Sequence, residues 1–448
     1  MATFRKSLFL LLSVALVFAL AACSGKKGGT EANDNSPQST QGAAQTDAPK
    51  EKIELTFWTL GNNGYETLVD KWNADHPDIQ VKVQNTGDQT AHHNNMLTAI
   101  SAGSGAPDIF MLEIGFMEKF LAATDNFYNL NDLGAQDLKG NYLDWKWQQA
   151  SSKDGSFQLG LPTDIGPTVL YYRQDLVQAA GLPADPAGLA AALDTWDKFA
   201  AAAKQYHEKT GKYFVDTTDL LHNALRDQSD GEIYLSKADG SFIGDTNPQV
   251  KKAFDYTVKA IQEGWVNPSP MWSPEWGQAT NNGDFAVMPA PAWMSGVIKG
   301  NAPDTAGKWR ITQLPEGAGN WGGSFLTIPK QSKHPKEAFA FISWMVSKEN
   351  QMESFKTNQL FPSIPAIYDE QEFKDFVDPS GFYGDQKIAQ EFAAAAQKVK
   401  PMYYGPQHDA IDAIFKNALR NVLEKKAEPA KEWDEAVKQA KEIVKRGG

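Results

Sequence analysis

The sequence predicts an α/β protein made of two lobes, and three observations support this fold class. Short apolar or alternating stretches typical of strands follow one another with stretches of helical periodicity between them, as in mostly parallel α/β sheets. About 400 residues follow the N-terminal segment, which is more than one hydrophobic core usually serves. Finally, residues 157–175 contain two apolar segments separated by Pro162, Gly166 and Pro167, which hold the backbone extended. We expect this stretch to cross between lobes; a β-hairpin with a six- or seven-residue loop is the alternative.

The N-terminus is typical of a secretory signal peptide over residues 1–22. Arg5 and Lys6 precede an uncharged run at 8–20, and small residues follow before Cys23. The run is too short to remain comfortably as a membrane-spanning helix. Its end, L-A-A-C, resembles the bacterial lipobox, which implies that Cys23 is lipidated, for example with palmitate, and begins the mature chain. An ordinary signal peptide with an incidental cysteine is the alternative.

Composition excludes several classes of function. Cys23 is the only cysteine, so the exported chain has no internal disulfide, thiol nucleophile or cysteine metal site. Residues 23–50 are rich in Gly, Ser, Thr, Asn and Gln, which predicts a flexible tether after the lipidated cysteine. The formal net charge of −12 becomes −14 without the two basic residues of 1–22, and Lys/Arg clusters are lacking, so nucleic-acid binding is not expected.

The first lobe begins with alternating strands and helices. The expected elements are a strand at 53–58, a helix carrying Tyr65, Leu68, Val69 and Trp72 on one face, a strand at 79–83, a helix at 89–102, a strand at 107–111 and a helix from 116. In parallel α/β sheets, ligands bind outside the carboxyl ends of the strands. That rule places Trp58 and Glu113 at the predicted cleft.

A second α/β unit starts after the proposed crossing, with a helix at 195–206. Further along the chain, the expected elements are an extended segment at 311–315, a strand at 321–329, a helix at 336–345, an extended segment at 359–364 and C-terminal helices ending at Gly447. Residues 265–293 contain Trp265, Trp272, Trp276 and Trp293 among Pro, Gly and Asn. Because helical spacing is absent, most of these rings are not expected to form a core stripe.

A resemblance covers nearly the whole mature chain. The motifs that carry it are, in order, L-T-F-W, P-D-I-F, L-P-T-D…L-Y-Y, G-L-P…T-W, F-A-V-M…W, W-G-G-S-F-L-T-I-P and P-K-E-A-F-A-F-I-S-W-M. Together, behind a lipobox, they resemble the extracellular solute-binding lipoproteins of ABC sugar importers, which are relatives of maltose-binding protein. The resemblance implies a periplasmic-binding-protein-like fold, with two α/β lobes joined by three crossing segments near 161–166, 315–321 and 359–362. A cleft between the lobes would close over a sugar or oligosaccharide.

The resemblance also implies the domain organisation and the partners. Residues 51–162 and 320–360 would form the N-terminal lobe, and residues 163–319 and 361–448 the C-terminal lobe. The protein would be a monomer anchored to the extracytoplasmic face of the cell membrane through Cys23. It would deliver a carbohydrate to permease subunits of an ABC transporter, without a cofactor, a metal or catalysis.

Two positions depart from the family pattern. The family often has Asn after the tyrosine of the first crossing, where this chain has Tyr172-Arg173. Pro291-Ala292-Trp293 replaces the usual glycine-then-tryptophan. Both departures leave the identity of the ligand open.

A sugar presents C–H faces that lie well on flat aromatic rings and hydroxyls that require hydrogen-bond partners. Tryptophan offers a large rigid contact surface, and carboxylates accept hydroxyl protons in strong, charge-assisted bonds. The candidate site residues are the platforms Trp58, Trp276, Trp293 and Trp321, the edge groups Glu113, Asp164 and Arg173, Tyr171 beside the crossing, Gly323 of the W-G-G-S motif, and Tyr403 or Tyr404. Packing in loops is the alternative for each tryptophan. Trp72, Trp196, Trp344 and Trp433 lie on amphipathic patterns and are expected in the core.

His92 and His93 do not predict a metal site. Adjacent histidines on a helix point about 100° apart, and no further ligand stands nearby with metal spacing. A solvated helix face is expected for both.

Two other functions remain open from the sequence. A surface-tethered glycosidase would use two carboxyl groups, for which Glu113 and Asp164 are candidates. The same fold could instead bind a peptide, a polyamine or an anion, and Arg173 and Arg310 keep that alternative open.

Overall fold

The computed structural model describes residues 52–61 and 63–447. The predicted signal peptide, the Cys23 lipidation site and the linker up to residue 50 lie outside the described residues. Residues 51–448 form one compact unit. Within the described part of the chain, every helix is too short or too polar to span a bilayer.

The first sheet has five strands. In spatial order they are β2 (Ile79–Asn85), β1 (Ile53–Thr59), β3 (Ile109–Glu113), β11 (Ser324–Thr327) and β4 (Gly160–Pro162). The β2–β1 and β1–β3 pairs are parallel, as predicted. The prediction of a mostly parallel sheet is wrong for the other two pairs, because β11 enters from a later crossing and runs antiparallel to both of its neighbours.

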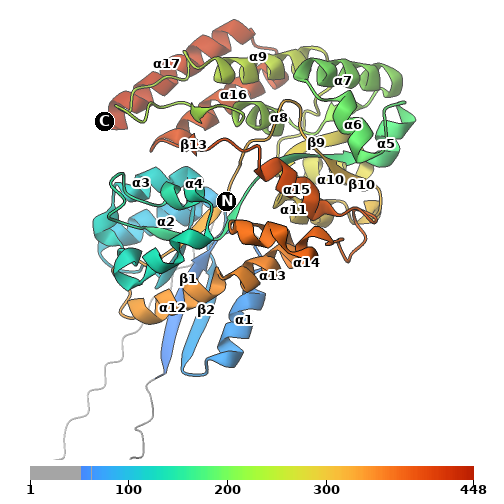
Figure 1. Ribbon diagram of the computed structural model, residues 1–448. Coiled ribbons are helices and arrows are strands. Elements are labelled where there is room, and N and C mark those ends of the chain that lie inside the picture. Colours follow the sequence, from blue (N-terminus) through green and yellow to red (C-terminus); the bar gives the residue numbers. More distant parts are fainter. Residues whose placement is uncertain (1–51, 62, 448) are drawn as a thin grey trace, which may run out of the picture. The chain divides into compact units, whose positions relative to one another are not determined.

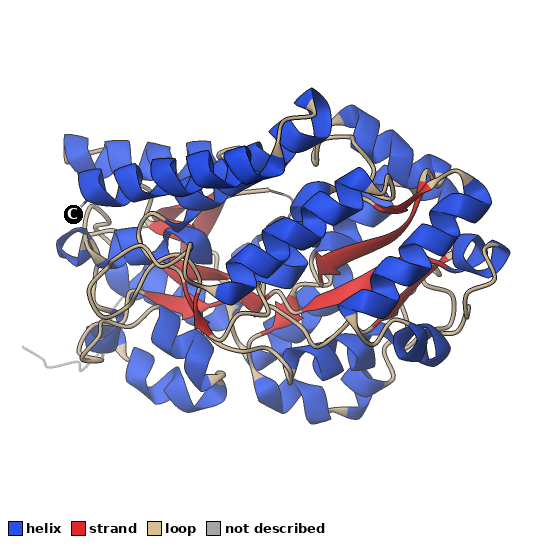
Figure 2. Ribbon diagram, turned by 90° about the horizontal axis from the view of Figure 1, so that it is seen from above, coloured by secondary structure: helices blue, strands red, loops and turns tan. Residues whose placement is uncertain are grey.

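The second sheet has four strands. In spatial order they are β10 (Trp309–Thr312), β6 (Thr168–Arg173), β9 (Phe285–Pro291) and β7 (Tyr213–Val215). Only the β7–β9 pair is parallel. The molecule therefore has two separate α/β lobes, each built around its own sheet, and helices accompany the strands of both (Figure 2).

Three segments join the two sheets. Strand β4 belongs to the first sheet and β6 to the second, so the alternative of a hairpin between them is wrong. Strand β5 (Asp164–Ile165) lies between them and pairs with β12 (Phe361–Pro362). The second connection runs from β10 to β11 and contacts the first: the amide of Trp321 donates to the carbonyl of Gly166 at 2.8 Å. The three predicted crossings are thus side by side.

The helices occupy the stretches between these strands. They are α1 (Tyr65–Asp75), α2 (Gln89–Ala102), α3 (Met117–Leu121), α4 (Asp144–Gln149), α5 (Gln174–Ala179), α6 (Pro186–Ala192), α7 (Trp196–Thr210), α8 (Thr218–Arg226), α9 (Pro248–Gln262), α10 (Pro274–Asn282), α11 (Met294–Asn301), α12 (Pro335–Met345), α13 (Lys348–Asn358), α14 (Gln371–Lys374), α15 (Ile388–Ala396), α16 (His408–Lys425) and α17 (Pro429–Gly447). Three shorter elements also matter for the site: the 3₁₀ turn η1 (Ile114–Phe116) and the paired strands β8 (Gly231–Glu232) and β13 (Met402–Tyr403).

Helix α2 illustrates how local sequence sets the element bounds. The carboxylate of Asp88 accepts hydrogen bonds from the amides of Thr90 and Ala91, which satisfies the free N–H groups of the first turn. Gly103 ends the helix in the left-handed conformation, where a residue with a Cβ is disfavoured. The predicted bounds of 89–102 are confirmed.

Segments far apart in sequence share the core of the first lobe. Phe341 of α12 packs edge-on against Phe57 of β1, with ring centroids 6.0 Å apart, and against Trp72 of α1 at 5.3 Å. Figure 1 shows α12, in orange, beside the blue strands β1 and β2. The predicted core positions of Trp72 and Trp196 are confirmed, and Trp344 and Trp433 are half-buried against the hydrophobic clusters.

The C-terminal helices complete the second lobe. Helix α16 packs against α8, α9 and α17 (Figure 1). Its first turn also contacts η1, which directly follows β3 of the first sheet. Helix α16 therefore brings residues of the second lobe against the carboxyl end of a strand of the first.

Candidate functional site

The carboxyl edge of the first sheet brings three predicted site residues together. Strand β3 ends at Glu113, whose register partner on β11 is Ser324. Gly323 directly precedes β11, and the amide of Ser324 donates to Oδ1 of Asp164 at 3.0 Å. Glu113, Asp164 and Gly323 therefore lie around one point, where the first and second crossings leave the sheet.

Asp164 is held firmly in this position. Its Oδ1 also accepts a hydrogen bond from the Thr163 hydroxyl at 2.6 Å, and the residue is 5% exposed. Burial raises the pKa of the Asp164 carboxyl, and the nearby charge of Lys146 opposes that rise. The carboxyl group thus has few free positions left for a ligand.

Lys146, on α4, is a member of this cluster that sequence reasoning missed. Its side chain is fully buried, its Nζ lies 3.8 Å from the centroid of the Phe325 ring, and no acceptor among the described residues binds it. Burial lowers the pKa of Lys146 to about 7, although Asp164 and Glu113 act in the opposite direction. A buried ammonium group without an acceptor suits a ligand hydroxyl or a bound water.

Glu113 faces a carboxylate from the other lobe. Its Oε2 accepts hydrogen bonds from Gln89 Nε2 at 2.8 Å and from the Gly115 amide at 2.7 Å. A Cβ built on Gly115 would lie 2.9 Å from that same oxygen and 2.7 Å from Oδ1 of Asp409, in the first turn of α16. Burial first, and then Asp409, raise the pKa of Glu113, and burial raises the pKa of Asp409.

Four indoles from the second lobe and the second crossing form a connected group, which we name the tryptophan row: Trp272, Trp276, Trp293 and Trp321. The rings of Trp272 and Trp293 have centroids 6.3 Å apart and planes within 15° of parallel. The rings of Trp293 and Trp321 are 5.1 Å apart, and those of Trp272 and Trp276 are 5.5 Å apart. Trp293 and Trp321 are half-buried, and Lys416 Nζ lies 5.8 Å from the Trp321 ring centroid. Trp293, in the middle of the row, closely follows the end of β9, at the edge of the second sheet that adjoins the crossings.

The W-G-G-S motif allows two side chains to approach the second crossing. Gly322 and Gly323 have φ values of 89° and 97°, which a residue with a Cβ rarely adopts. A Cβ on Gly322 would lie 2.8 Å from Nε1 of Trp293, which donates to the Trp321 carbonyl at 3.0 Å. A Cβ on Gly323 would lie 2.8 Å from Nζ of Lys146. The two glycines therefore make room for an indole and for a lysine.

Trp276 is not the open platform that the sequence predicted. Its ring is 1% exposed, lies behind Trp272, and donates through Nε1 to Oδ2 of Asp216 at 3.2 Å. Asp216 directly follows β7, and its Oδ1 has no partner among the described residues. The exposed member of this pair is Trp272, which sequence reasoning did not select; it is 54% exposed.

Tyr171 and Arg173 are both bound to partners of their own. The Tyr171 ring is fully buried, and its hydroxyl donates to the carbonyls of Pro291 and Ala292, each at 3.0 Å. Arg173 lies at the far end of β6, where its guanidinium binds Asp175 at 2.9 and 2.8 Å. Arg310 lies on β10 beside that same end. Since β6 starts at the crossing and runs away from it, neither arginine reaches the cluster around Asp164.

The remaining predicted residues lie nearby, with partners of their own. Trp58 is half-buried near the carboxyl end of β1, and its Nε1 donates to Gln84 Oε1 at 3.1 Å. Tyr404 is 5% exposed, and its hydroxyl donates to the carbonyl of Asn320 in the second crossing at 2.9 Å. Their contact with a ligand stays a prediction.

The expectation of a solvated face for His92 and His93 is wrong. Both side chains are fully buried and stack on aromatic rings, His92 on Phe110 at 4.4 Å and His93 on Phe116 at 3.8 Å. Burial lowers the pKa of His92 to about 4 and that of His93 to about 3, so both rings are neutral. The Glu113 amide donates to His93 Nε2 at 3.1 Å, so this histidine supports the end of β3.

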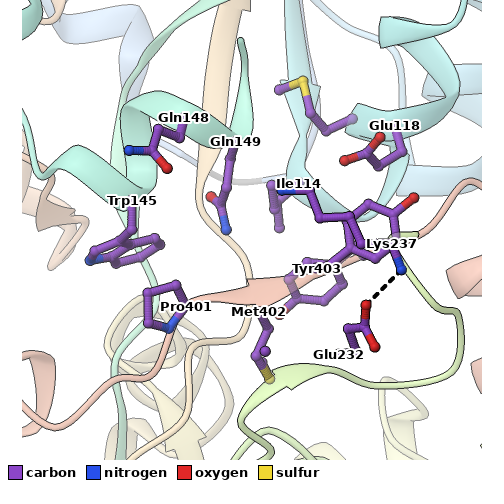
Figure 3. A pocket seen from close by; sticks show the side chains of 13 residues that line it. Ile114, Glu118, Trp145, Gln148, Gln149, Glu232, Lys237, Pro401, Met402 and Tyr403 are labelled. Atoms are coloured by element: carbon purple, nitrogen blue, oxygen red, sulfur yellow. Dashed lines mark hydrogen bonds between the residues drawn. The ribbon is translucent and has the colours of Figure 1, made fainter. Parts of the chain in front are cut away.

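A cavity of about 350 Å³, which we name the interlobe pocket, lies between α3 and α4 of the first lobe and β8 and β13 of the second. Figure 3 shows the rings of Trp145 and Tyr403 together with the amides of Gln148 and Gln149 around it. Glu118, Glu232 and Lys237 complete its polar lining. Of the predicted site residues, Tyr403 and Tyr404 line this pocket.

The comparisons with known proteins agree with this architecture. The family model for bacterial extracellular solute-binding proteins matches residues 59–352. An arabinooligosaccharide-binding protein of Halalkalibacterium halodurans is 27% identical over 410 residues, which cover 87% of this chain and 88% of that protein. A lactose-binding protein of Rhizobium radiobacter is 26% identical over 384 residues, which cover 82% and 85% of the two chains.

A crystal structure of a family 1 extracellular solute-binding protein is 34% identical, with a TM-score of 0.79, and the match covers 88% of this chain and all of that one. The predicted fold class, two α/β lobes joined by three crossings, is confirmed. The matched segments extend over most of the chain, and this protein therefore belongs to the bacterial extracellular solute-binding proteins.

Proposed function

We propose that this protein captures a carbohydrate, and specifically an oligosaccharide, outside the membrane and delivers it to the permease of an ABC transporter. The observation that carries the proposal is the tryptophan row beside a cluster of buried charged groups. Indole faces suit the C–H faces of sugar rings, and Glu113 and Lys146 offer an acceptor and a donor for hydroxyls. The arabinooligosaccharide- and lactose-binding relatives support the same ligand class.

The cellular context is part of the proposal. Lipidation of Cys23 would hold the protein at the extracytoplasmic face of the cell membrane, with residues 24–50 as a tether. We propose that the protein acts as a monomer, with residues 51–162 and 320–360 as the N-terminal lobe and residues 163–319 and 361–448 as the C-terminal lobe.

The competing functions have less support. An anion-binding role rested on Arg173 and Arg310, which lie at the end of the second sheet away from the crossings. A glycosidase needs two carboxyl groups free to flank one bond, whereas Asp164 is already bonded to Thr163 and Ser324. We therefore propose a binding protein without catalytic activity.

A titration of the purified chain tests the proposal. Arabino-oligosaccharides and lactose are added while tryptophan fluorescence and the melting temperature are followed, because a ligand bound to the folded state stabilises it by about 2.7 kcal/mol at a concentration of 100 Kd. We expect a saturable response that Arg173→Ala leaves unchanged. A response to inorganic anions or peptides only, lost in Arg173→Ala, would refute the proposal. Release of labelled sugar products would refute the absence of catalysis.

A further inference from the structure

Trp272 has two unusual features for a tryptophan. Its side chain is 54% exposed, whereas large aromatic side chains contribute most when they are buried. Its backbone φ is 72°, in the left-handed region that residues with a bulky side chain rarely adopt. A strained backbone that presents an exposed indole gains nothing from core packing, and such strain clusters at ligand-binding positions.

The local chain holds Trp272 rigidly in this position. Pro270 and Pro274 stand two residues away on either side, and each fixes its own φ. Ser273, the next residue, caps α10 by accepting a hydrogen bond from the Trp276 amide at 3.2 Å. The backbone of the strained residue is therefore restrained between two prolines and a helix cap, and its ring packs on those of Trp276 and Trp293.

The ring continues the tryptophan row away from the crossings. Its plane is within 15° of that of Trp293, so the two faces share an orientation, and Trp293 in turn contacts Trp321 on the second crossing. Exposure increases from half-buried Trp321 and Trp293 to Trp272, whereas the fourth ring, Trp276, is buried behind Trp272. The three rings Trp321, Trp293 and Trp272 thus extend from the joint of the lobes towards solvent.

A pair of charged groups lies near Met271, the neighbour of Trp272 in the sequence. Met271 lines a small crevice together with Thr218, Asp219 and Arg420. The Asp219 and Arg420 side chains form an ion pair at 3.9 Å and are 13% and 41% exposed. A carboxylate and a guanidinium are groups that bind sugar hydroxyls.

We propose that Trp272 is an outer sugar platform, and that the ligand is an oligosaccharide whose chain leaves the cleft over this ring. The inner units lie on Trp321 and Trp293, and a further unit lies on Trp272. This inference rests on the proposed function. It adds that contact with Trp272 makes the affinity increase with the length of the sugar chain.

The test compares chain lengths. Arabino-oligosaccharides of two, four and six units are titrated by calorimetry into the full exported chain, as wild type, Trp272→Ala and Trp272→Phe. Val377→Ala, the other large hydrophobic side chain exposed in the described residues, is the matched control. Because the Trp272 ring also covers that of Trp276, the melting temperature of each variant is measured as well; a loss of stability alone would weaken binding equally at every chain length.

We expect Trp272→Ala to weaken binding of the six-unit sugar by about tenfold and of the two-unit sugar by less than about twofold. Trp272→Phe should restore most of the loss, and Val377→Ala should have no effect. Acrylamide quenching of wild-type fluorescence should fall with every bound sugar, because the inner units cover Trp321 and Trp293, and it should fall further with the six-unit sugar, which also covers Trp272. Equal losses at every length, or no loss, would overturn the inference while the proposed function stands. No binding of any sugar by the wild type would overturn both.

Discussion

The tryptophan row and the interlobe pocket both combine aromatic rings with polar groups, but they are built differently. The row consists of rings that pack on one another, with Trp293 in the middle and its Nε1 fixed by the Trp321 carbonyl. In the pocket, Trp145 comes from α4 and Tyr403 from β13, so two distant parts of the chain supply the two rings. A row of mutually packed rings is preorganised, whereas a pocket between two lobes exists only where they meet. We infer that the row supplies most of the affinity.

Removal of the central ring is expected to have the largest effect. Trp293→Ala removes a platform and the contacts that orient its two neighbours, and we expect sugar affinity to fall by about 100-fold, as for a central aromatic hot spot. Trp145→Ala in the interlobe pocket is the matched variant, with an expected change of less than about threefold. Calorimetric titration of both variants gives the comparison directly. A larger loss for Trp145→Ala would move the ligand site to the interlobe pocket.

A smaller effect is expected from a change that shifts the central ring without removing it. Gly322→Ala places a Cβ 2.8 Å from Trp293 Nε1 at a φ of 89°, so the indole must move. We expect a loss of affinity of about tenfold and a destabilisation of about 1–3 kcal/mol from the backbone strain.

Gly317→Ala is the control for that strain. Gly317 lies on the same crossing with a φ of 137°, and a Cβ there meets no atom within 4 Å. It should lower the melting temperature by a comparable amount and leave the affinity unchanged. If both variants lose affinity equally, then backbone strain in the second crossing, and not the position of Trp293, causes the loss of sugar affinity.

Local sequence patterns predict most of the fold. The helix at 89–102 has its cap at Asp88 and its stop at Gly103 within the segment itself. The first crossing is visible in its own prolines and glycine. The direction of β11 is not visible, because it depends on a chain reversal that only the assembled sheet shows.

The site is predicted less well, because burial depends on partners far away in sequence. Trp276 is buried because Asp216, 60 residues earlier, accepts its N–H. Lys146 resembles any charged residue on a short helix until Gly323 of the second crossing packs against it. For Trp276 a local signal did exist: Ser273-Pro274 starts a helix, and Trp276 then lies in its first turn instead of in a loop.

The smallest effect concerns the charged cluster around Glu113, and it depends on pH. The carboxyl of Glu113 has an ordinary pKa of 4.5, which burial and Asp409 raise in the folded protein. Folding therefore takes up protons between pH 4.5 and the raised pKa, so this group lowers the stability as the pH increases through that window.

Glu113→Gln keeps the hydrogen-bond acceptor for Gln89 and Gly115 but removes the charge. We expect the variant to match the wild type near pH 4 and to exceed its free energy of unfolding by at least about 1 kcal/mol at pH 8, since one pKa unit corresponds to about 1.36 kcal/mol. Urea unfolding of the ligand-free protein at both values measures the difference. Sugar affinity at pH 8 should fall by less than about fivefold, because one hydrogen bond is weakened while the indoles remain. If the variant is less stable than the wild type at pH 8, then Lys146 stabilises the ionised Glu113 carboxylate more than burial and Asp409 destabilise it. If the variant loses more affinity than Trp293→Ala does, then the charged cluster, and not the tryptophan row, supplies most of the binding energy.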